Sequence, residues 1–496
     1  QINLKKTITI FFTFLISILL YPQEKKKIDI KNADFTYINN KKHPDYWRLI
    51  GNVNIYHNET NMFCDSAYYF SEKEKIIAFN NIKINKGDSI NLLGEKLNYD
   101  GEKGIAIISK NVILKNTTSD IESDKLIYDI NKEIIFYNSR SQIVKEKEKI
   151  SSNKGMFYIE KNEYQFLDSV VLKSKKYSLN TNKLIFNENE NINYLQGPSK
   201  IYFEDKTIYC EEGYIFNEKS EFFKNSYIEN KDFKINADSI FYSDLKKSIK
   251  AYGNVFLTDT INNMVLSGNE ADFFEKEEKM IFKNRPLLQL ISDSDTLFIN
   301  ANKFENFILN NNNLIIAYSN VKFTNNNIIG KCDSLTYYNS DSIITMYEKP
   351  IIWLDEYQVF SDTIKINYYD KKINKMYLKS KPMIISKIDT QEYNQIKGKK
   401  MTGNFIENKL SIINVSGNGQ SIYFLKEKKE TIGMNYLESS TINLVFKNKK
   451  INNINYEATP HSLTTPIEDL KHKDRFLKEF KWRINEKPTI NEIINQ

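Results

Sequence analysis

A unit of about 30 residues recurs along this chain and constrains its fold more than any other feature. Residues 51–70 (GNVNIYHNETNMFCDSAYYF) and 253–274 (GNVFLTDTINNMVLSGNEADFF) share one order: Gly-Asn-Val, an apolar run, a polar gap, an acidic residue among small ones, and an aromatic pair. We take the acidic position of each copy as an anchor. The anchors are Asp65, Glu95, Asp124, Lys154, Asn182, Glu212, Asp238, Glu270, Asn302, Asp333 and Asp362.

The side chains after each anchor alternate in polarity. The residue directly after the anchor is small, polar or charged, whereas those two and four places after it are apolar or aromatic in nearly every copy; Asp272 is an exception. This alternation is typical of a strand with one buried face. The candidates that we select to line the interior are Tyr69, Leu97, Tyr99, Leu126, Tyr128, Tyr158, Leu184, Phe186, Phe216, Ile240, Tyr242 and Phe274.

A second alternating stretch follows a turn-like sequence in each copy, such as GNVNI at 51, KNVIL at 110 and, with proline, EKPIIW at 348. Each copy is therefore predicted to be strand, turn, strand. The 31 Tyr and 31 Phe, against 16 Gly and 9 Pro, also favour strands. Many strands with one buried face must curl or pair into a roll, a barrel or a solenoid with an apolar interior.

The two ends of the chain depart from the repeat. Residues 1–23 are predicted to be a signal peptide, because Lys5-Lys6 precede an apolar run that is shorter than the roughly 20 residues of a membrane span. A retained membrane anchor is the alternative. Residues 456–496 are predicted to be a tail, with a short amphipathic helix between Ile467 and Trp482 that caps the last strand or docks on a partner.

Residue types that carry catalysis are sparse. Cys64, Cys210 and Cys332 have neither a disulfide pattern nor metal-ligand spacing, and the four histidines form no cluster. No catalytic residue, metal site or cofactor is predicted, so we expect that the chain is not an enzyme. The net charge of +7 is mild for 496 residues and gives no support for nucleic-acid binding.

The phased strand-turn units resemble the OstA-like family, which is related to the periplasmic lipopolysaccharide-transport proteins LptA, LptC and the N-terminal domain of LptD. The resemblance rests on the recurring GNV and on CDSAYYF (64–70), INADSIFY (235–242), LSGNEADFF (266–274) and GKCDSLTYY (330–338), and covers about residues 30–455. It implies an all-β fold, an elongated and twisted β-jellyroll. The region is expected to be one roll or two to three segments, with a break near 200–235.

The resemblance also implies a function. We expect a periplasmic bridge or scaffold in lipopolysaccharide transport and outer-membrane assembly, whose apolar groove shields acyl chains. It is expected to be free in the periplasm or associated with the outer membrane. The expected partners are lipopolysaccharide or lipid A and other jellyroll proteins, joined edge to edge at a strand within Ala33 to Tyr56, with Lys41, Lys42 and Pro44 as its few protecting residues. The alternatives are a surface or secreted β-solenoid that binds or cleaves polysaccharide, and an outer-membrane β-barrel component.

Overall fold

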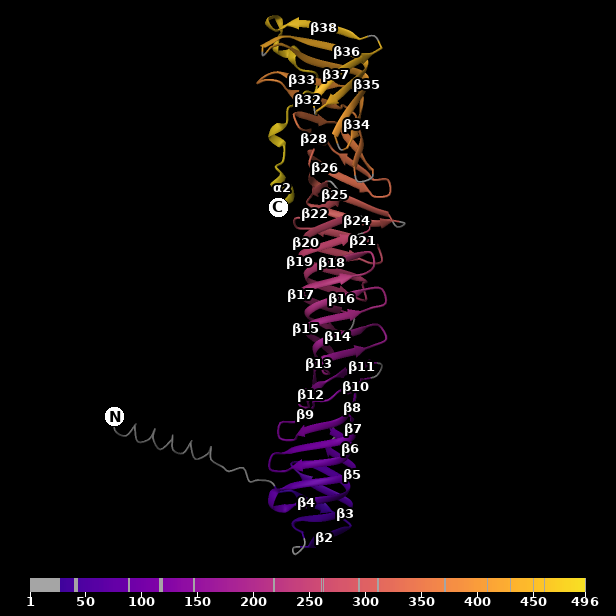
Figure 1. Cartoon of the computed structure of the whole chain (residues 1–496), viewed down its shortest axis with the longest axis vertical. Coiled ribbons are helices and arrows are strands. Elements are labelled where there is room, and N and C mark those ends of the chain that lie inside the picture. Colours follow the sequence, from indigo (N-terminus) through magenta and orange to yellow (C-terminus); the bar gives the residue numbers. More distant parts are fainter. Residues whose placement is uncertain are drawn as a thin grey trace, which may run out of the picture. The chain divides into compact units, whose positions relative to one another are not determined.

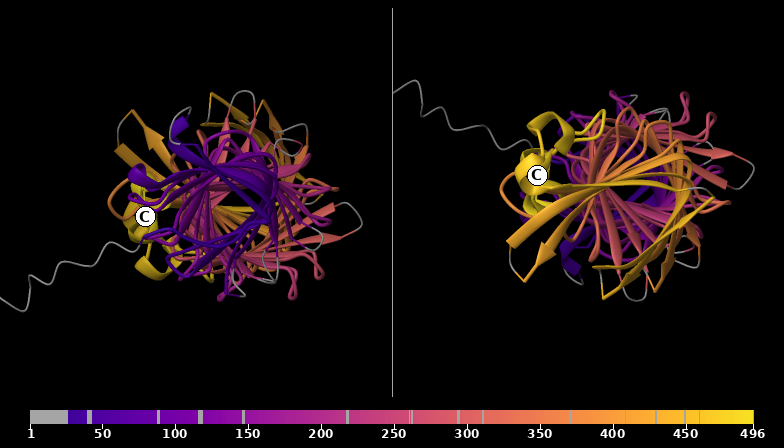
Figure 2. Two further views of the ribbon diagram at one scale, coloured as in Figure 1. Left: turned by 90° about the horizontal axis from the view of Figure 1, so that it is seen from below. Right: turned by 90° about the horizontal axis from the view of Figure 1, so that it is seen from above.

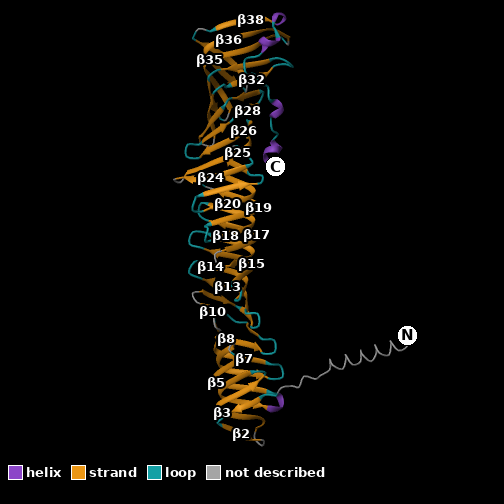
Figure 3. Ribbon diagram, turned by 180° about the vertical axis from the view of Figure 1, so that it is seen from behind, coloured by secondary structure: helices purple, strands orange, loops and turns teal. Residues whose placement is uncertain are grey.

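The computed structural model describes residues 27–39, 43–87, 90–115, 119–145, 148–216, 219–259, 261, 263–292, 295–309, 312–369, 372–407, 409–428, 430–448, 450–458 and 460–495. The predicted signal peptide and Lys41-Lys42 lie outside these residues. The chain divides into two compact units, 1–204 and 205–496. Both consist of antiparallel strands with very little helix (Figure 3), so the predicted all-β fold is confirmed.

The first unit is a ladder of strands in which each hairpin pairs with the next. Its strands are β1 (Asp29–Asn32), β2 (Phe35–Asn39), β3 (His43–His57), β4 (Thr60–Phe70), β5 (Lys75–Lys86), β6 (Ile90–Asp100), β7 (Ile105–Lys115), β8 (Asp120–Asp129), β9 (Ile134–Tyr137), β10 (Ser141–Lys145), β11 (Glu148–Ser152), β12 (Lys154–Tyr158), β13 (Glu163–Lys173), β14 (Ser178–Asn187) and β15 (Ile192–Tyr202). Successive strands stack one above another within the unit (Figure 1).

The second unit continues the same pattern and ends in longer strands. Its elements are β16 (Thr207–Phe216), β17 (Lys219–Glu229), β18 (Phe233–Ser243), β19 (Ser248–Asp259), β20 (Met264–Phe274), β21 (Lys279–Lys283), β22 (Leu287–Ile291), β23 (Thr296–Asn300), β24 (Lys303–Leu309), β25 (Asn312–Thr324), β26 (Ile329–Tyr338), β27 (Ile343–Tyr347), β28 (Ile351–Leu354), β29 (Tyr357–Phe360), β30 (Thr363–Tyr369), β31 (Lys372–Lys379), β32 (Met383–Lys387), β33 (Tyr393–Lys397), β34 (Lys400–Ile406), β35 (Lys409–Glu427), β36 (Glu430–Lys447), β37 (Lys450–Glu457), β38 (His461–Pro466) and α2 (Ile490–Ile494). Seen end-on, the strands of this unit fan out as expected for a twisted sheet (Figure 2).

The Gly-Asn sequences are corners inside single strands. In β3 the pairing register shifts between Ile50 and Val53, and Gly51 and Asn52 have φ of 77° and 41°. This is a β-bulge, which bends a strand without ending it. The prediction of a turn between two strands was therefore wrong for this copy, because two left-handed residues divide one long strand into two halves. At the proline copy EKPIIW the prediction is confirmed, because β27 ends at Tyr347 and β28 begins at Ile351.

Contacts across the interior join the two halves of the roll. In the first unit, His57 Nδ1 at the end of β3 is hydrogen-bonded to the Tyr99 hydroxyl on β6. The Ser119 hydroxyl lies 2.8 Å from that of Tyr164 on β13. These residues are far apart in sequence, so the interior of this unit is closed by its own side chains.

The N-terminal edge strand is formed by β1 and β2, which both pair with one side of β3. Strand β3 also pairs with β4 on its other side. The predicted edge from Ala33 to Tyr56 was therefore partly wrong, because Asn54 and Tyr56 lie in an internal strand. The outer strand exposes Phe35, Tyr37 and Ile38, with 62%, 59% and 52% of their surfaces accessible.

The C-terminal segment from 467 to 495, which we call the strap, folds back along the second unit (Figure 1). A short C-terminal helix is present, but it is α2. The residues predicted to be helical, Ile467 to Trp482, instead form short 3-10 turns at Ile467–Asp469 and His472–Arg475 joined by non-helical backbone. Leu470 and Leu477 of the strap pack against a buried cluster of Met383, Ile385, Ile422, Phe424 and Met434.

Two fully buried glutamines hold the strap by its backbone. Gln395 donates to the carbonyl of Arg475 at 2.8 Å and accepts from the amide of Leu477 at 2.8 Å. Gln358 binds Lys481 and Arg483 in the same way, at 2.7 and 2.6 Å. Each side-chain amide thus takes the place of a backbone peptide in a short two-bond ladder.

Charged contacts also fix the far part of the strap. Hydrogen bonds from Arg483 and Lys331 lower the pKa of the Glu486 carboxyl to about 2. Asn300 donates to the carbonyl of Ile493 at 3.2 Å, and the Ile493 side chain is fully buried. The strap therefore covers an apolar face of the second unit along most of its own length.

Candidate functional site

Most of the predicted lining residues lie on the buried face of the strands. Each of nine has no more than 6% of its surface exposed, namely Tyr69, Leu97, Tyr99, Leu126, Tyr128, Leu184, Phe186, Ile240 and Tyr242. Aromatic rings of neighbouring strands stack along this row. The Tyr164 ring lies 4.3 Å from that of Phe157 and 6.1 Å from that of Phe186, between centroids.

The other three candidates, Tyr158, Phe216 and Phe274, are half-buried and lie off this row. Their neighbours Phe157 and Phe273 are buried, and Ile215 continues the alternation of the buried Gly213 although it is itself half-buried. The anchors Lys154, Glu212 and Glu270 were each set one residue too late. Because side chains alternate between faces, that slip moves a predicted residue to the other face of the strand.

The anchor carboxylates have a structural role at the corners. Asp65 accepts a hydrogen bond from the side-chain amide of Asn81 at 2.9 Å, and Asp238 accepts one from Asn254 at 3.0 Å. Each bond ties an anchor to the bulge of the next strand. The repeated acidic residue is therefore explained by the fold.

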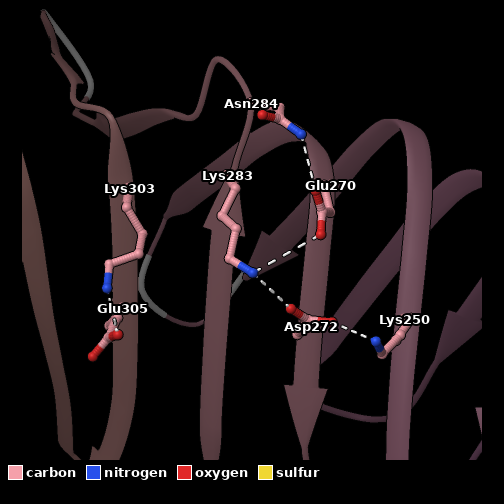
Figure 4. Close-up of polar contacts among 7 residues, drawn as sticks. All are labelled: Lys250, Glu270, Asp272, Lys283, Asn284, Lys303 and Glu305. Carbon is pink, nitrogen blue, oxygen red and sulfur yellow. Dashed lines mark hydrogen bonds and ion pairs between the residues drawn. The ribbon is translucent and has the colours of Figure 1, made fainter.

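Charged side chains of neighbouring strands β19, β20, β21 and β24 contact one another (Figure 4). Asp272, the polar exception in the repeat, points outward with Glu270. Lys283 reaches Asp272 at 3.1 Å and Glu270 at 3.9 Å, and Lys250 lies 4.0 Å from Asp272. Partners on both neighbouring strands explain how a carboxylate can be only 8% exposed on a sheet surface.

A cavity of about 370 Å³ opens into the apolar interior of the second unit. This volume lies within the range of about 300–1,000 Å³ that is usual for ligand sites. Apolar residues from β17 to β21 form most of its wall. They are Ile228, Phe233, Ile235, Ile249, Phe273, Phe274 and Met280.

Charged residues stand around this cavity. The Lys206 ammonium lies 2.6 Å from a carboxylate oxygen of Glu275 and 4.9 Å from the centre of the Tyr242 ring. Burial opposes the charge of Lys206, but the hydrogen bond to Glu275 and other neighbours outweigh it and raise the pKa of Lys206. Lys279 also lines the cavity, 3.2 Å from Glu305. The site is thus apolar inside with ion pairs around it.

Of the residues that line this cavity, the sequence predicted only Phe274. Tyr242, also predicted, lies beside the cavity next to Lys206. Sequence reasoning missed Phe233, Ile249 and Met280. Ile249 and Met280 lie on the buried alternation of their strands, so the signal was present. That alternation marks every buried position alike, and the cavity arises only where neighbouring side chains leave the interior unfilled.

Other chemistry is sparse in the described part of the chain. All three cysteines are buried and free, and burial raises the pKa of the Cys64 and Cys210 thiols to about 12. Among the residues that the structure describes, no group of His, Cys, Asp and Glu is arranged to hold a metal ion. Within the same residues, no helix has the length and apolar character needed to span a membrane.

Comparisons with known proteins find two matching families. Residues 25–182 match the family described as OstA-like protein, and residues 234–372 match the LptA/(LptD N-terminal domain) LPS transport protein family. A search of curated proteins gives no significant match. The predicted resemblance to the OstA-like family is confirmed by the two family matches.

A solved structure is also similar to part of the chain. It is LptH, the LptA homologous periplasmic component of the conserved lipopolysaccharide transport device from Pseudomonas aeruginosa. The alignment has 11% identity and a TM-score of 0.20, and it covers 22% of this chain and 81% of that chain.

Proposed function

We propose that this chain is a periplasmic component of a lipopolysaccharide-transport bridge, in which it shields acyl chains inside its β-jellyroll. The observation that carries the proposal is the apolar cavity beside Phe233, Ile249 and Met280, most of which lies within the segment that matches the LptA and LptD family. The second matched family is described as a transport protein and not as an enzyme. A role in outer-membrane assembly is part of the same proposal.

The energetics of acyl chains favour such an interior. Exposure to water costs about 0.8 kcal/mol for each methylene, so a chain of about 14 carbons would meet a penalty near 10 kcal/mol outside a membrane. A cavity lined by aliphatic and aromatic side chains removes most of this penalty. Entry of a lipid into the interior of the first unit requires closed positions such as Tyr99 and Tyr128 to move apart, since both are buried by their neighbours.

A photo-crosslinking residue at Ile249 is expected to capture lipopolysaccharide, because this side chain lines the cavity. The matched control is Lys250, the next residue of the same strand, which faces outward. Mass spectrometry of the crosslinked protein measures capture. Equal capture at both positions, or capture at neither, would contradict the proposed cavity. Additional capture at Tyr128 would show that lipid also enters the closed interior.

The outer strand formed by β1 and β2 supports edge-to-edge joining with another jellyroll protein. Unpaired backbone groups at such an edge invite a strand from a partner. We expect the double substitution Phe35→Lys and Tyr37→Lys to abolish detectable end-to-end association, because charges on an edge oppose strand addition. Both side chains are exposed, so the fold should be retained.

Analytical ultracentrifugation and pull-down with jellyroll partners measure this association. Tyr252→Lys is the control, because Tyr252 is 38% exposed but lies on β19, an internal strand. Unchanged association in the double variant would exclude this edge as the joint and favour the C-terminal strands β37 and β38.

A further inference from the structure

Five lysines surround an open hollow on the second unit. The hollow has a volume of about 460 Å³ and lies beside the corner after β31 and the loop between β33 and β34. Its walls contain one acidic residue. The lining residues are Lys379, Ser380, Lys381, Lys397, Gly398, Lys399, Lys400 and Glu479.

The charges of the hollow are far from balanced. Lys397 forms an ion pair with Glu479, whereas the other four lysines make no ion pair with any residue in the described part of the chain. The hydrogen bond from Lys397, together with the charges of Lys381 and Lys478, lowers the pKa of the Glu479 carboxyl. The hollow therefore provides a positive field that favours an anion.

Glu479 belongs to the strap, and the fold places its carboxylate at the hollow. Gln395 fixes the backbone at Arg475 and Leu477, and Lys397 on the same face of β33 donates to the carbonyl of Lys478 at 3.2 Å. Glu479 itself has a φ of 74°, which is unusual for a residue with a side chain. An anionic group of the protein thus already occupies one side of the lysine hollow.

We propose that this hollow binds phosphate groups of an anionic lipid headgroup, with Glu479 as the competing internal anion. Each lysine binds phosphate as a separate point charge. Several lysines around one open hollow can therefore bind a phosphorylated headgroup in more than one orientation. The inference is independent of the acyl-chain cavity, because the hollow is built from other strands. Failure of one proposal would therefore leave the other standing.

The test measures binding of the full chain to vesicles of phosphatidylglycerol and phosphatidylcholine in equal amounts. The double variant Lys381→Gln and Lys400→Gln should bind more weakly, by about fivefold for each lysine. The control is Lys125→Gln with Lys200→Gln, which removes two exposed lysines of the first unit. Binding to the hollow should also weaken as salt is added, because the interaction is largely electrostatic.

A second variant tests the competing carboxylate. Glu479→Gln keeps the shape of the side chain and removes its charge, so vesicle binding should strengthen several-fold. Weaker binding by Glu479→Gln, or equal losses in the two lysine double variants, would overturn the proposal. Loss of vesicle binding by the hollow variant alone supports it.

Binding of inorganic pyrophosphate distinguishes a site for soluble phosphate from a site for a lipid headgroup. Calorimetric binding of pyrophosphate that requires Lys381 and Lys400 would show that a soluble phosphate is sufficient. Lysine-dependent binding to vesicles without binding to pyrophosphate would assign the hollow to a lipid headgroup. Both results support phosphate recognition, whereas no lysine-dependent binding of either probe would overturn it.

Discussion

Deletion of the strap, residues 467–496, is expected to lower the free energy of unfolding of the second unit by about 5 to 9 kcal/mol. Leu470, Leu477 and Ile493 are all buried in the folded chain, and full burial of such a side chain contributes about 1.5 to 3 kcal/mol. Urea unfolding measures the loss. Because Met383, Phe424 and their neighbours would become accessible, the truncated protein should also bind a hydrophobic dye.

The variant Gln395→Leu separates the contribution of the glutamine hydrogen bonds to the strap from that of the apolar contacts. It removes both bonds to Arg475 and Leu477 and should destabilise the strap by about 1 to 3 kcal/mol, the cost of unpaired buried polar groups. For the deletion of residues 467–496, an unchanged free energy of unfolding together with no dye binding would show that the strap does not stabilise the second unit.

Gly253→Val is expected to destabilise the second unit by about 3 kcal/mol or more. Gly253 has a φ of 72°, and a Cβ there would clash with a carboxylate oxygen of Asp238. Backbone strain of this kind costs about 1 to 3 kcal/mol, and the clash would also disturb the bond between Asp238 and Asn254. Chemical unfolding of the unit that carries the substitution measures the effect.

Gly87→Val is the matched control, since Gly87 has a φ of 54° but a Cβ there meets no atom within 4 Å. It should show the backbone strain without the clash. Equal losses at the two glycines would mean that the contact with Asp238 has no part in stabilising the corner.

The repeated strands could be predicted from sequence because their signal is local. Alternation of apolar and polar residues marks the buried row at Leu97, Tyr99, Leu126 and Tyr128, all of which are buried. Adjacent polar residues limit this reasoning, because alternation alone does not say which of them is the anchor. Glu211 and Glu212 are adjacent acidic residues, and choosing the second moved Phe216 to the wrong place in the alternation.

The strap could not be predicted in the same way. Its apolar residues have nearly helical spacing, yet their positions are fixed by Gln358 and Gln395, which are distant in sequence. The lysine hollow likewise joins two short lysine-rich stretches to Glu479. Sequence alone shows each stretch, whereas the fold determines that they meet.

The sequential pairing of strands determines how a unit of this fold can change in length. Within a unit, a strand pairs with its near neighbours in sequence, so a new copy of the repeat can be inserted without altering distant contacts. One copy adds two strands, or about 10 Å along the stack, since neighbouring strands lie about 5 Å apart. The length of a unit can therefore change only in increments of one copy, and the number of copies determines the distance that the unit spans.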